Sequence, residues 1–233
     1  MENKKIRINR YLFLNNFCSR READRWIEDG LVLVNNKKAI LGQKIDIQND
    51  KVKILKKAVE IQKNKITILI NKPKGYVSHN PQKGEKDILE LVPYKQLSPI
   101  GRLDKKSYGL MILSDDGRLV NKILNPNFYH EKEYIIKVNK KITSFFLNQM
   151  EKGVNIEGYK TKKAKVKKIS DRKFNLILTE GKKHQIRRMC QALGYTVVDL
   201  QRIRIMNWKI GNLKSGEWKK ISKEEIHNFL EDL

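Results

Sequence analysis

The segment at residues 100–117 constrains the fold of this chain more than any other part of its sequence. It contains I-G-R-L-D-K-K-S-Y-G-L-M-I-L-S-D-D-G, in which a Gly-Arg turn leads into a charged loop with one carboxylate, Asp104. The apolar run at residues 110–113 then predicts a buried strand, and the turn residues at 114–117 end it. The segment therefore predicts a charged loop joined directly to a strand of the core.

Three cations surround Asp104 in the sequence, namely Arg102, Lys105 and Lys106. Because nearby positive charge favours the ionised form of a carboxyl group, we expect a low pKa for Asp104 and a full charge at neutral pH. The same local charges are also typical of a surface aspartate in a solvated basic loop. These four residues alone leave both interpretations open.

The whole segment is more informative than its charges. The pattern G-R-L-D-x-x-S-x-G-L, followed by a D-G turn, resembles the catalytic motif of the pseudouridine synthases, in particular the branch that modifies ribosomal RNA. The resemblance implies that Asp104 acts as nucleophile or base at the ribose. It also implies that Arg102 occupies the space left by a flipped base or holds the flipped nucleotide. The resemblance also implies that Lys105 and Lys106 lie in a loop that contacts RNA. These two lysines and Tyr108 replace family residues that often include an acid and a small polar side chain.

Three further segments resemble motifs of this family in the same order. They are N-K-P-K-G-Y at residues 71–76, E-K-E-Y at 131–134 and E-G-x-x-H-Q-I-R-R-M at 180–189. The resemblance implies that Tyr134 lies against the target base, that Arg187 pairs with Asp104, and that Ile186 packs near the uracil. Taken alone, a tyrosine on a strand is more often a core residue, and the first motif is also typical of an ordinary exit from a strand.

The N-terminal part has its own signature. Ser19 predicts an N-cap for a helix at residues 20–29, with Glu22 completing a capping box and Gly30 ending the helix. The sequence S-R-R-E-A-D-R-W-I-E-D-G-L-V-L-V-N resembles the S4 RNA-binding domain. The resemblance implies RNA phosphate contacts from the helix, and the candidate residues are Arg20, Arg21 and Arg25. A solvated helix face on any small α+β domain would have the same charges.

The charge balance limits the choice of partner. The chain of 233 residues has 50 Lys and Arg against 26 Asp and Glu, a net charge of +24, which favours a polyanion. No apolar run approaches the length of a membrane span, so we expect RNA rather than a membrane as partner. Cys18 and Cys190 form no C-x-x-C pair, and with four scattered histidines they give no metal-ligand spacing. We expect a cytoplasmic monomer, and the family resemblance implies no cofactor and no metal.

We therefore predict an α+β protein with an S4-like RNA-binding domain at residues 1–60 and a pseudouridine synthase catalytic domain at 64–233. The second domain is expected to contain a mixed, mainly antiparallel sheet flanked by helices. Residues 58–64 are predicted to be a linker, and residues 195–198 and 200–206 to be two strands. The lysine-rich strands predicted at residues 153–168 suit RNA contact, but lysines also protect sheet edges from aggregation.

Two functional hypotheses follow. The first is site-specific conversion of uridine to pseudouridine in RNA, and the segments E-K-E-Y-I-I-K-V and H-Q-I-R-R-M-C-Q-A-L-G-Y most resemble the F-type 23S ribosomal RNA enzymes. The same chemistry on 16S ribosomal RNA or tRNA is an alternative substrate choice. The second hypothesis is an RNA-binding or ribosome-assembly factor without catalysis. The presence of Asp104, Tyr134 and Arg187 favours the enzyme, because a pure binder gains nothing from an acid placed against polyanionic RNA.

Overall fold

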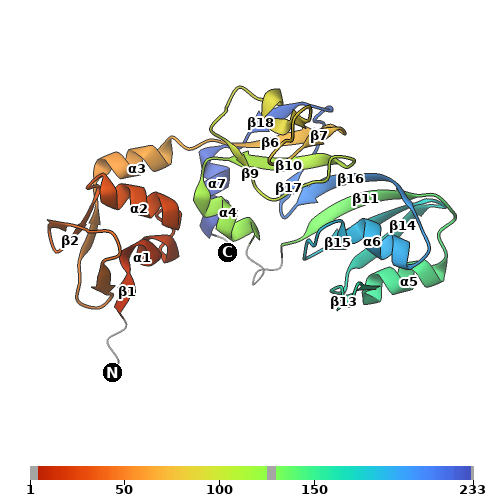
Figure 1. Ribbon diagram of the computed structural model, residues 1–233, viewed down its shortest axis with the longest axis horizontal. Helices are drawn as coiled ribbons and strands as arrows, with labels where there is room; N and C mark the ends of the chain where they lie inside the picture. Colours follow the sequence, from red (N-terminus) through yellow and green to blue (C-terminus); the bar gives the residue numbers. More distant parts are fainter. Residues whose placement is uncertain (1–4, 125–129, 232–233) are drawn as a thin grey trace. The chain divides into compact units, whose positions relative to one another are not determined.

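A computed structural model of the chain describes residues 5–124 and 130–231, which form two compact units (Figure 1). One unit contains the chain up to Thr67, the segment Ser114–Ile123 and the segment that begins at Lys220; the other contains Ile68–Leu113 and Leu124–Lys219. Both units combine segments that are far apart in the sequence. The domain boundary predicted between residues 60 and 64 stays a prediction.

The N-terminal part of the first unit is a small α+β core. Its elements are β1 (Lys5–Arg7), α1 (Ile8–Leu14), α2 (Arg20–Glu28), β2 (Val32–Val34), β3 (Lys37–Lys38), β4 (Lys44–Asp46), β5 (Val52–Ile54) and α3 (Lys56–Lys63). Strands β3, β2 and β5 form one antiparallel sheet, and β1 pairs with β4. Ile8 and Leu12 of α1, Trp26 and Ile27 of α2, and Val32 of β2 are buried in one apolar cluster. This cluster holds both helices against the short strands.

Helix α2 begins at the predicted cap. The Ser19 Oγ accepts a hydrogen bond from the backbone N–H of Glu22 at 3.3 Å, which confirms Ser19 as the N-cap. The reciprocal half of the predicted capping box is wrong, because the Glu22 carboxylate instead pairs with the Lys65 ammonium at 2.8 Å. Gly30 follows the helix with a φ of +65°, a conformation that glycine adopts without steric cost.

The predicted linker at residues 58–64 is also wrong. Most of it belongs to helix α3, which ends at Lys63. Ala58 is completely buried in the apolar cluster, and Ile61 packs against the same cluster. The spacing of three residues puts both side chains on one face of a helix. Tertiary packing of this face therefore stabilises a helix where the polar composition suggested none.

The second unit is built around a nine-stranded sheet. Its main path runs β14-β15-β11-β16-β10-β6-β18, with β17 beside β16 and β9 beside β10. The bounds are β6 Thr67–Lys72, β9 Ser98–Pro99, β10 Tyr108–Ser114, β11 Lys132–Val138, β14 Lys165–Ser170, β15 Lys173–Leu178, β16 Val197–Ile205, β17 Trp208–Lys209 and β18 Trp218–Lys220. Strand β11 is antiparallel to β15 and β16, β14 is antiparallel to β15, and β10 is parallel to β16. The predicted α+β class with a mixed, mainly antiparallel sheet is confirmed.

The sheet also corrects one prediction. Residues 195–198 and 200–206 do not form two strands, because β16 is continuous across Asp199. This charged residue is tolerated inside the strand because its carboxylate accepts a hydrogen bond from the Tyr108 hydroxyl and pairs with the Lys74 ammonium.

Two helices lie against one end of the sheet (Figure 1). Helix α5 (Ser144–Lys152) packs against β14, and α6 (Gln185–Ala192) packs against β12 (Asn155–Ile156) and β16. Phe146 of α5 meets Phe174 of β15 edge-on, with ring centroids 5.3 Å apart. The remaining elements are β7 (Tyr76–Val77), β8 (Lys86–Asp87), the short 3₁₀ helix Ile88–Leu91, α4 (Gly117–Leu124), β13 (Tyr159–Lys160) and α7 (Lys223–Glu231). In the part of the chain that the structure describes, no helix is long and apolar enough to cross a membrane.

Strands β10 and β16 approach each other unusually closely at one position. Gly109 pairs with Arg202 in the parallel ladder and has a φ of +113°. A Cβ atom on Gly109 would lie 2.2 Å from the Arg202 carbonyl oxygen and 2.7 Å from its backbone nitrogen. Only glycine satisfies both the backbone conformation and the space at this position.

We expect Gly109→Ala to lower the free energy of unfolding by on the order of 3 kcal/mol, because it combines backbone strain with a clash against another strand. The matched control is Gly84→Ala, where φ is +83° but no atom lies within 4 Å of the added carbon. The control is expected to lose only about 1 kcal/mol. Urea unfolding of both variants measures the difference, and equal losses would contradict the close-approach argument.

Candidate active site

The loop at residues 100–107 leads into β10 and is fixed by hydrogen bonds to its backbone. The Ser78 hydroxyl donates to the Leu103 carbonyl at 2.7 Å and accepts from the Leu103 N–H at 3.1 Å. The Ser107 N–H donates to the Asp104 carbonyl at 2.9 Å, which closes a turn around Asp104. The Gly75 N–H donates to the Lys105 carbonyl at 2.8 Å. The backbone of Asp104 is therefore held from both sides.

The Asp104 carboxylate meets two residues from the start of α6. Its Oδ2 lies 3.2 Å from His184 Nδ1 and 3.9 Å from Arg187 Nε. The Asp104 side chain is 34% exposed, so it remains accessible from solvent. Among the residues that the structure describes, none forms a hydrogen bond or ion pair with Oδ1. The carboxylate is thus oriented through one oxygen and open at the other.

Arg187 is itself held in place. Its Nη2 donates to the Ser107 hydroxyl at 3.1 Å, and its Nη1 donates to the Val197 carbonyl at 3.3 Å. These contacts join α6 to the Asp104 loop and to β16. Since an arginine guanidinium is planar, these two hydrogen bonds fix the orientation of the whole group, whose Nε lies 3.9 Å from Asp104 Oδ2.

His184 was not identified from the sequence. It is the N-cap of α6 and has a φ of 52°, in the left-handed region that only a few per cent of residues other than glycine adopt, most often Asn, Asp and His. This conformation orients the imidazole toward Asp104, at the contact described above. Residues in such strained conformations cluster at functional sites. The motif letters at 180–189 contain this histidine, but nothing in them reveals its backbone conformation.

The cations that neighbour Asp104 in the sequence have other surroundings. The Lys105 ammonium pairs with Glu85 at 3.0 Å, while Arg102 and Lys106 have exposed side chains. The residues that contact the Asp104 carboxylate therefore come from the start of α6, about 80 residues later in the chain, and not from the loop itself.

A buried arginine braces the two ends of the loop. Arg202 of β16 is 3% exposed, and its Nε donates to the Leu110 carbonyl at 2.7 Å. Its Nη1 donates to the Arg102 carbonyl at 3.3 Å. Within the described residues its Nη2 is buried without a hydrogen-bond partner. Arg202 therefore ties β16 to the residues on both sides of Asp104.

Two lysines, one fully buried and one partly buried, add to the positive charge around this loop. Lys72 is fully buried at the end of β6, and its ammonium donates to the carbonyls of Pro73 and Tyr76 at 2.9 and 2.8 Å. Burial lowers the pKa of Lys72 to about 8; the Asp104 carboxylate opposes this shift and Arg202 adds to it. Burial and then the Arg202 charge also lower the pKa of Lys132, again to about 8.

Tyr134 lies on β11, the strand that pairs with the strand of Arg202. It is 8% exposed and stands opposite Arg202 in the β11–β16 ladder. Opposed residues of neighbouring strands project to the same face, so Tyr134 lies on the face that carries the Arg202 side chain. Ile186, beside Arg187 on α6, is 6% exposed and belongs to the core of this unit.

A second polar group links the 71–76 segment to the same loop. The Tyr108 hydroxyl donates to Asp199 Oδ2 at 2.8 Å, and the Lys74 ammonium pairs with Asp199 and lies 4.9 Å from the centre of the Tyr108 ring. Burial and the bond to Asp199 raise the pKa of Tyr108 to about 12. Tyr108 therefore keeps its proton and its hydrogen bond at neutral pH.

The thiols are poorly suited to nucleophilic chemistry. Cys18 and Cys190 are both buried, and burial raises the pKa of each thiol to about 12. The half-exposed Asp104 carboxylate is instead the group that is both accessible and held in one orientation. It can act as a nucleophile or as a base toward a ligand that approaches from solvent.

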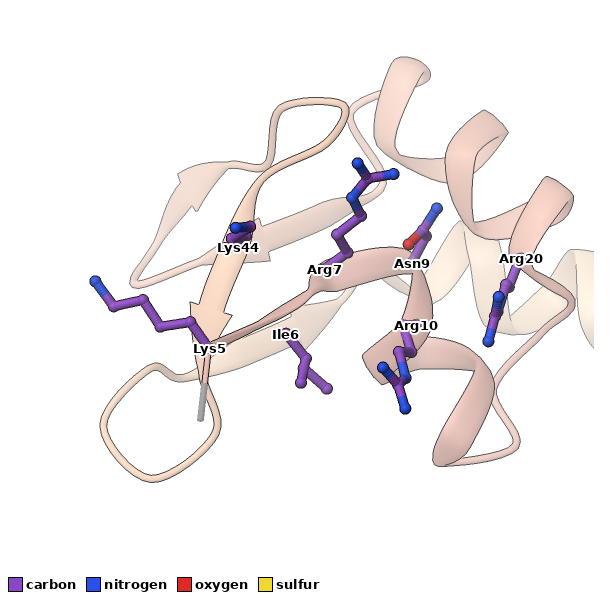
Figure 2. A pocket seen from close by; sticks show the side chains of 7 residues that line it. All are labelled: Lys5, Ile6, Arg7, Asn9, Arg10, Arg20 and Lys44. Atoms are coloured by element: carbon purple, nitrogen blue, oxygen red, sulfur yellow. The ribbon is translucent and has the colours of Figure 1, made fainter. Parts of the chain in front are cut away.

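The predicted RNA-contacting helix α2 lies in the other unit. Arg20, Arg21 and Arg25 all have exposed side chains. Arg20 also lines an open pocket with Lys5, Ile6, Arg7, Asn9, Arg10 and Lys44. Figure 2 shows Arg10 and Arg20 extending from neighbouring helices toward the same side of this pocket. The pocket brings together cations of α1, α2, β1 and β4 that the sequence pattern did not connect, whereas Arg21 and Arg25 do not line it.

The comparisons with known proteins agree with both motif resemblances. Residues 65–192 match the family model for RNA pseudouridylate synthase, and residues 6–60 match the model for the S4 domain. The chain is 43% identical over 224 residues to the dual-specificity RNA pseudouridine synthase RluF of Escherichia coli K12, which covers 95% of this chain and 77% of the relative. Identity to RluF of Salmonella typhi is 44% over 223 residues, covering 94% of this chain and 77% of the relative.

A solved structure confirms the fold of the whole chain. A crystal structure of a pseudouridylate synthase superposes with a TM-score of 0.69 at 26% identity, covering 95% of this chain and 98% of that one. The similarity inferred from four short motifs therefore extends over nearly all of the described sequence.

The buried Lys72 predicts a pH-dependent stability. Its pKa is 10.5 in the unfolded chain and about 8 in the fold, so between these values the unfolded state binds the proton more tightly. The contribution of Lys72 to the free energy of unfolding therefore rises from about pH 8 to about pH 10.5, by roughly 1.4 kcal/mol for each pKa unit of difference.

Lys72→Met removes this contribution. The difference in the free energy of unfolding, wild type minus variant, is therefore expected to increase from about pH 8 to about pH 10.5. Urea unfolding at several pH values measures it. Lys106→Met, at an exposed position of the same unit, is the control and is expected to give a flat difference. A flat difference for Lys72→Met as well would contradict the argument.

Proposed function

This chain belongs to the RNA pseudouridylate synthase family, and we propose that it converts one uridine of 23S ribosomal RNA to pseudouridine with Asp104 as the catalytic carboxylate. The observation that carries the assignment of Asp104 is its geometry. Its side chain is 34% exposed, its Oδ2 lies beside His184 and Arg187, and its Oδ1 forms no hydrogen bond with a described residue. Such an oriented, accessible oxygen is what attack on a bound nucleotide requires.

The reaction breaks the bond between the uracil nitrogen and the ribose, rotates the base, and joins the ribose to C5 of the same base. In the final step C5 loses its proton and N1, now freed from the ribose, gains one, so the product has the same atoms as the substrate. Asp104 acts as nucleophile or base at the ribose. Arg187 and His184 act as positioning residues, because each touches the carboxylate rather than the reacting bond.

The remaining residues receive the flipped nucleotide. Removing a base from its stack costs a few kcal/mol, which contacts to the extruded uridine must offset. Tyr134 provides an aromatic face for the base, where stacking contributes roughly 1–3 kcal/mol, and assists removal of the C5 proton. Ile186 provides apolar packing near the uracil. Exposed Arg102 occupies the vacated position in the RNA, and the exposed Lys105 and Lys106 contact its backbone.

The names of the relatives indicate that they act on RNA, but they do not say which RNA. The RluF proteins are called dual-specificity RNA pseudouridine synthases. We propose 23S ribosomal RNA as the main substrate of this chain, and modification of a tRNA as well is an outcome that the mapping experiment below distinguishes. A factor that only binds RNA is disfavoured, since a pure binder would have no use for an oriented carboxylate in a strongly positive site.

The test of catalysis is Asp104→Asn, which preserves the size of the side chain and removes its charge. Turnover is expected to fall by at least about 10³-fold, because the amide is a poor nucleophile and base. RNA affinity is expected to stay within a few-fold. Pseudouridine mapping of 23S, 16S and transfer RNA from cells with the wild-type gene, the variant gene or no gene gives the readout.

Loss of one 23S site on deletion, restored by the wild type and not by Asp104→Asn, is the expected result. Restoration of that site by the variant would overturn the role of Asp104. If deletion changes no site in any of the three RNAs while the purified protein still binds 23S ribosomal RNA, the binding-only function gains support.

We also propose that the basic pocket of the first unit binds RNA phosphates, with Arg10 and Arg20 each contacting one. Arg10→Gln combined with Arg20→Gln removes two of its cations and is expected to reduce the slope of log affinity against log salt by about 1.4–1.8, that is 0.7–0.9 per phosphate contact. The control is Lys37→Gln with Lys38→Gln, two exposed lysines of β3. Arg21→Gln with Arg25→Gln measures separately whether the outer face of α2 contributes. Equal slopes for the pocket variant and the β3 control would argue against the pocket.

A further inference from the structure

A group of exposed lysines lies on two segments next to the candidate active site. Lys160, Lys162 and Lys163 come at the end of β13 and just after it, and Lys182 and Lys183 come in the loop before α6. We call these five residues the lysine ridge. The two segments are about 20 residues apart in the sequence, so their relation depends on contacts in the folded chain.

Glu180 fastens the two segments together. Its carboxylate accepts hydrogen bonds from the Tyr159 hydroxyl at 2.5 Å, the Lys162 N–H at 2.9 Å and the Gln185 side-chain amide at 2.6 Å. The Lys182 ammonium also lies 5.0 Å from the centre of the Tyr159 ring. The hairpin β12–β13 and the loop before α6 therefore form one surface.

A further ion pair supports the same arrangement. Arg188 of α6 pairs with Glu157, at the tip of the β12–β13 hairpin. Glu157 is ion-paired with Arg188, and Glu180 adds one negative charge beside the five lysines, so this surface keeps a net positive charge. The acids near the ridge are structural, and the positive charge remains exposed to solvent.

Two of the three lysines on the edge strand β14 are ion-paired with described residues. On β14, Lys165 pairs with Glu131 at 2.8 Å and Lys168 pairs with Asp171 at 3.3 Å. By contrast, Lys160, Lys163 and Lys183 have no ion pair with any residue in the described ranges. Edge protection accounts for the lysines of β14, including the exposed Lys167, but Lys160 lies on the β12–β13 hairpin and Lys183 in the loop before α6, and neither belongs to that strand.

The lysine ridge is next in sequence to a residue that contacts Asp104. Lys183 immediately precedes His184, whose imidazole lies 3.2 Å from Asp104. Consecutive Cα atoms are about 3.8 Å apart, so the ridge begins one residue from a group that touches the carboxylate. A nucleotide bound at Asp104 would bring its own strand close to these lysines.

We infer that the lysine ridge binds the phosphate backbone of the RNA strand that flanks the target uridine. The inference rests on the proposed function, because it takes Asp104 as the place where the uridine is bound. Lysine is a flexible point charge and suits phosphates without selecting a base sequence. The ridge therefore positions the RNA and contributes affinity, while the choice of uridine is made elsewhere.

The test removes the three unpaired charges with Lys160→Gln, Lys163→Gln and Lys183→Gln in one variant. The matched control removes the same charge with Lys165→Gln, Lys168→Gln and Lys173→Gln on β14 and β15. The probe is a fluorescein-labelled 23S ribosomal RNA hairpin that contains the uridine modified by the wild-type protein, and anisotropy is measured across a salt series. The ridge variant is expected to lose about 2.1–2.7 from the salt slope and at least roughly tenfold in affinity at 0.15 M salt, because three phosphate contacts are gone.

The control is expected to change affinity less than threefold. Steady-state kinetics should show a raised KM with kcat retained for the ridge variant, since phosphate contacts act equally in the ground and transition states. A salt slope that matches the control would overturn the inference, as would a loss of kcat with KM unchanged. Failure of the proposed function gives a different result. In that case the wild-type protein would form no pseudouridine in 23S ribosomal RNA, whatever salt slopes the variants show with an unmodified RNA transcript.

Discussion

The candidate active site depends on buried cations that bond to backbone carbonyls. Arg202 holds the carbonyls of Arg102 and Leu110, and Lys72 holds those of Pro73 and Tyr76. Burying an isolated charge costs several kcal/mol, and a hydrogen bond to a charged group returns about 1.5–3 kcal/mol. These buried cations therefore contribute little net free energy to the stability of the core. Their benefit is that they specify the path of two loops, one of which contains Asp104.

The same arrangement sets the electrostatics of the site. The charge of buried Arg202 acts on both Lys72 and Lys132, and Arg187 approaches the Asp104 carboxylate from α6. A site with several cations and one acid attracts an anionic ligand over distances up to the Debye length, about 8 Å at physiological salt. The lysine ridge extends this positive field outward from the loop before α6. Binding of a polyanion and orientation of the carboxylate thus come from the same group of elements.

The sequence predicted the parts of the fold that local chemistry controls, and missed those that tertiary packing controls. The apolar run of β10 and the Ser19 cap follow from periodicity and hydrogen-bonding side chains, and both are present. Helix α3 was missed because its stability comes from burying Ala58 in a distant cluster. At the site, the motifs identified the segments, but the burial of Lys72 and the left-handed backbone of His184 depend on neighbours that no local pattern encodes.

The partners of Asp104 illustrate this limit most clearly. Local charge suggested that Arg102, Lys105 and Lys106 stabilise the carboxylate, yet Lys105 pairs with Glu85, and the residues in contact with Asp104 come from α6. Flexible exposed lysines contribute a diffuse field that salt screens, and they do not fix a direction. The Arg187 guanidinium can fix a direction, because it is already hydrogen-bonded to Ser107 and Val197. An acid that must attack a single atom needs direction as well as charge, so the residues that orient it have to be anchored in a different element from the loop it stands on.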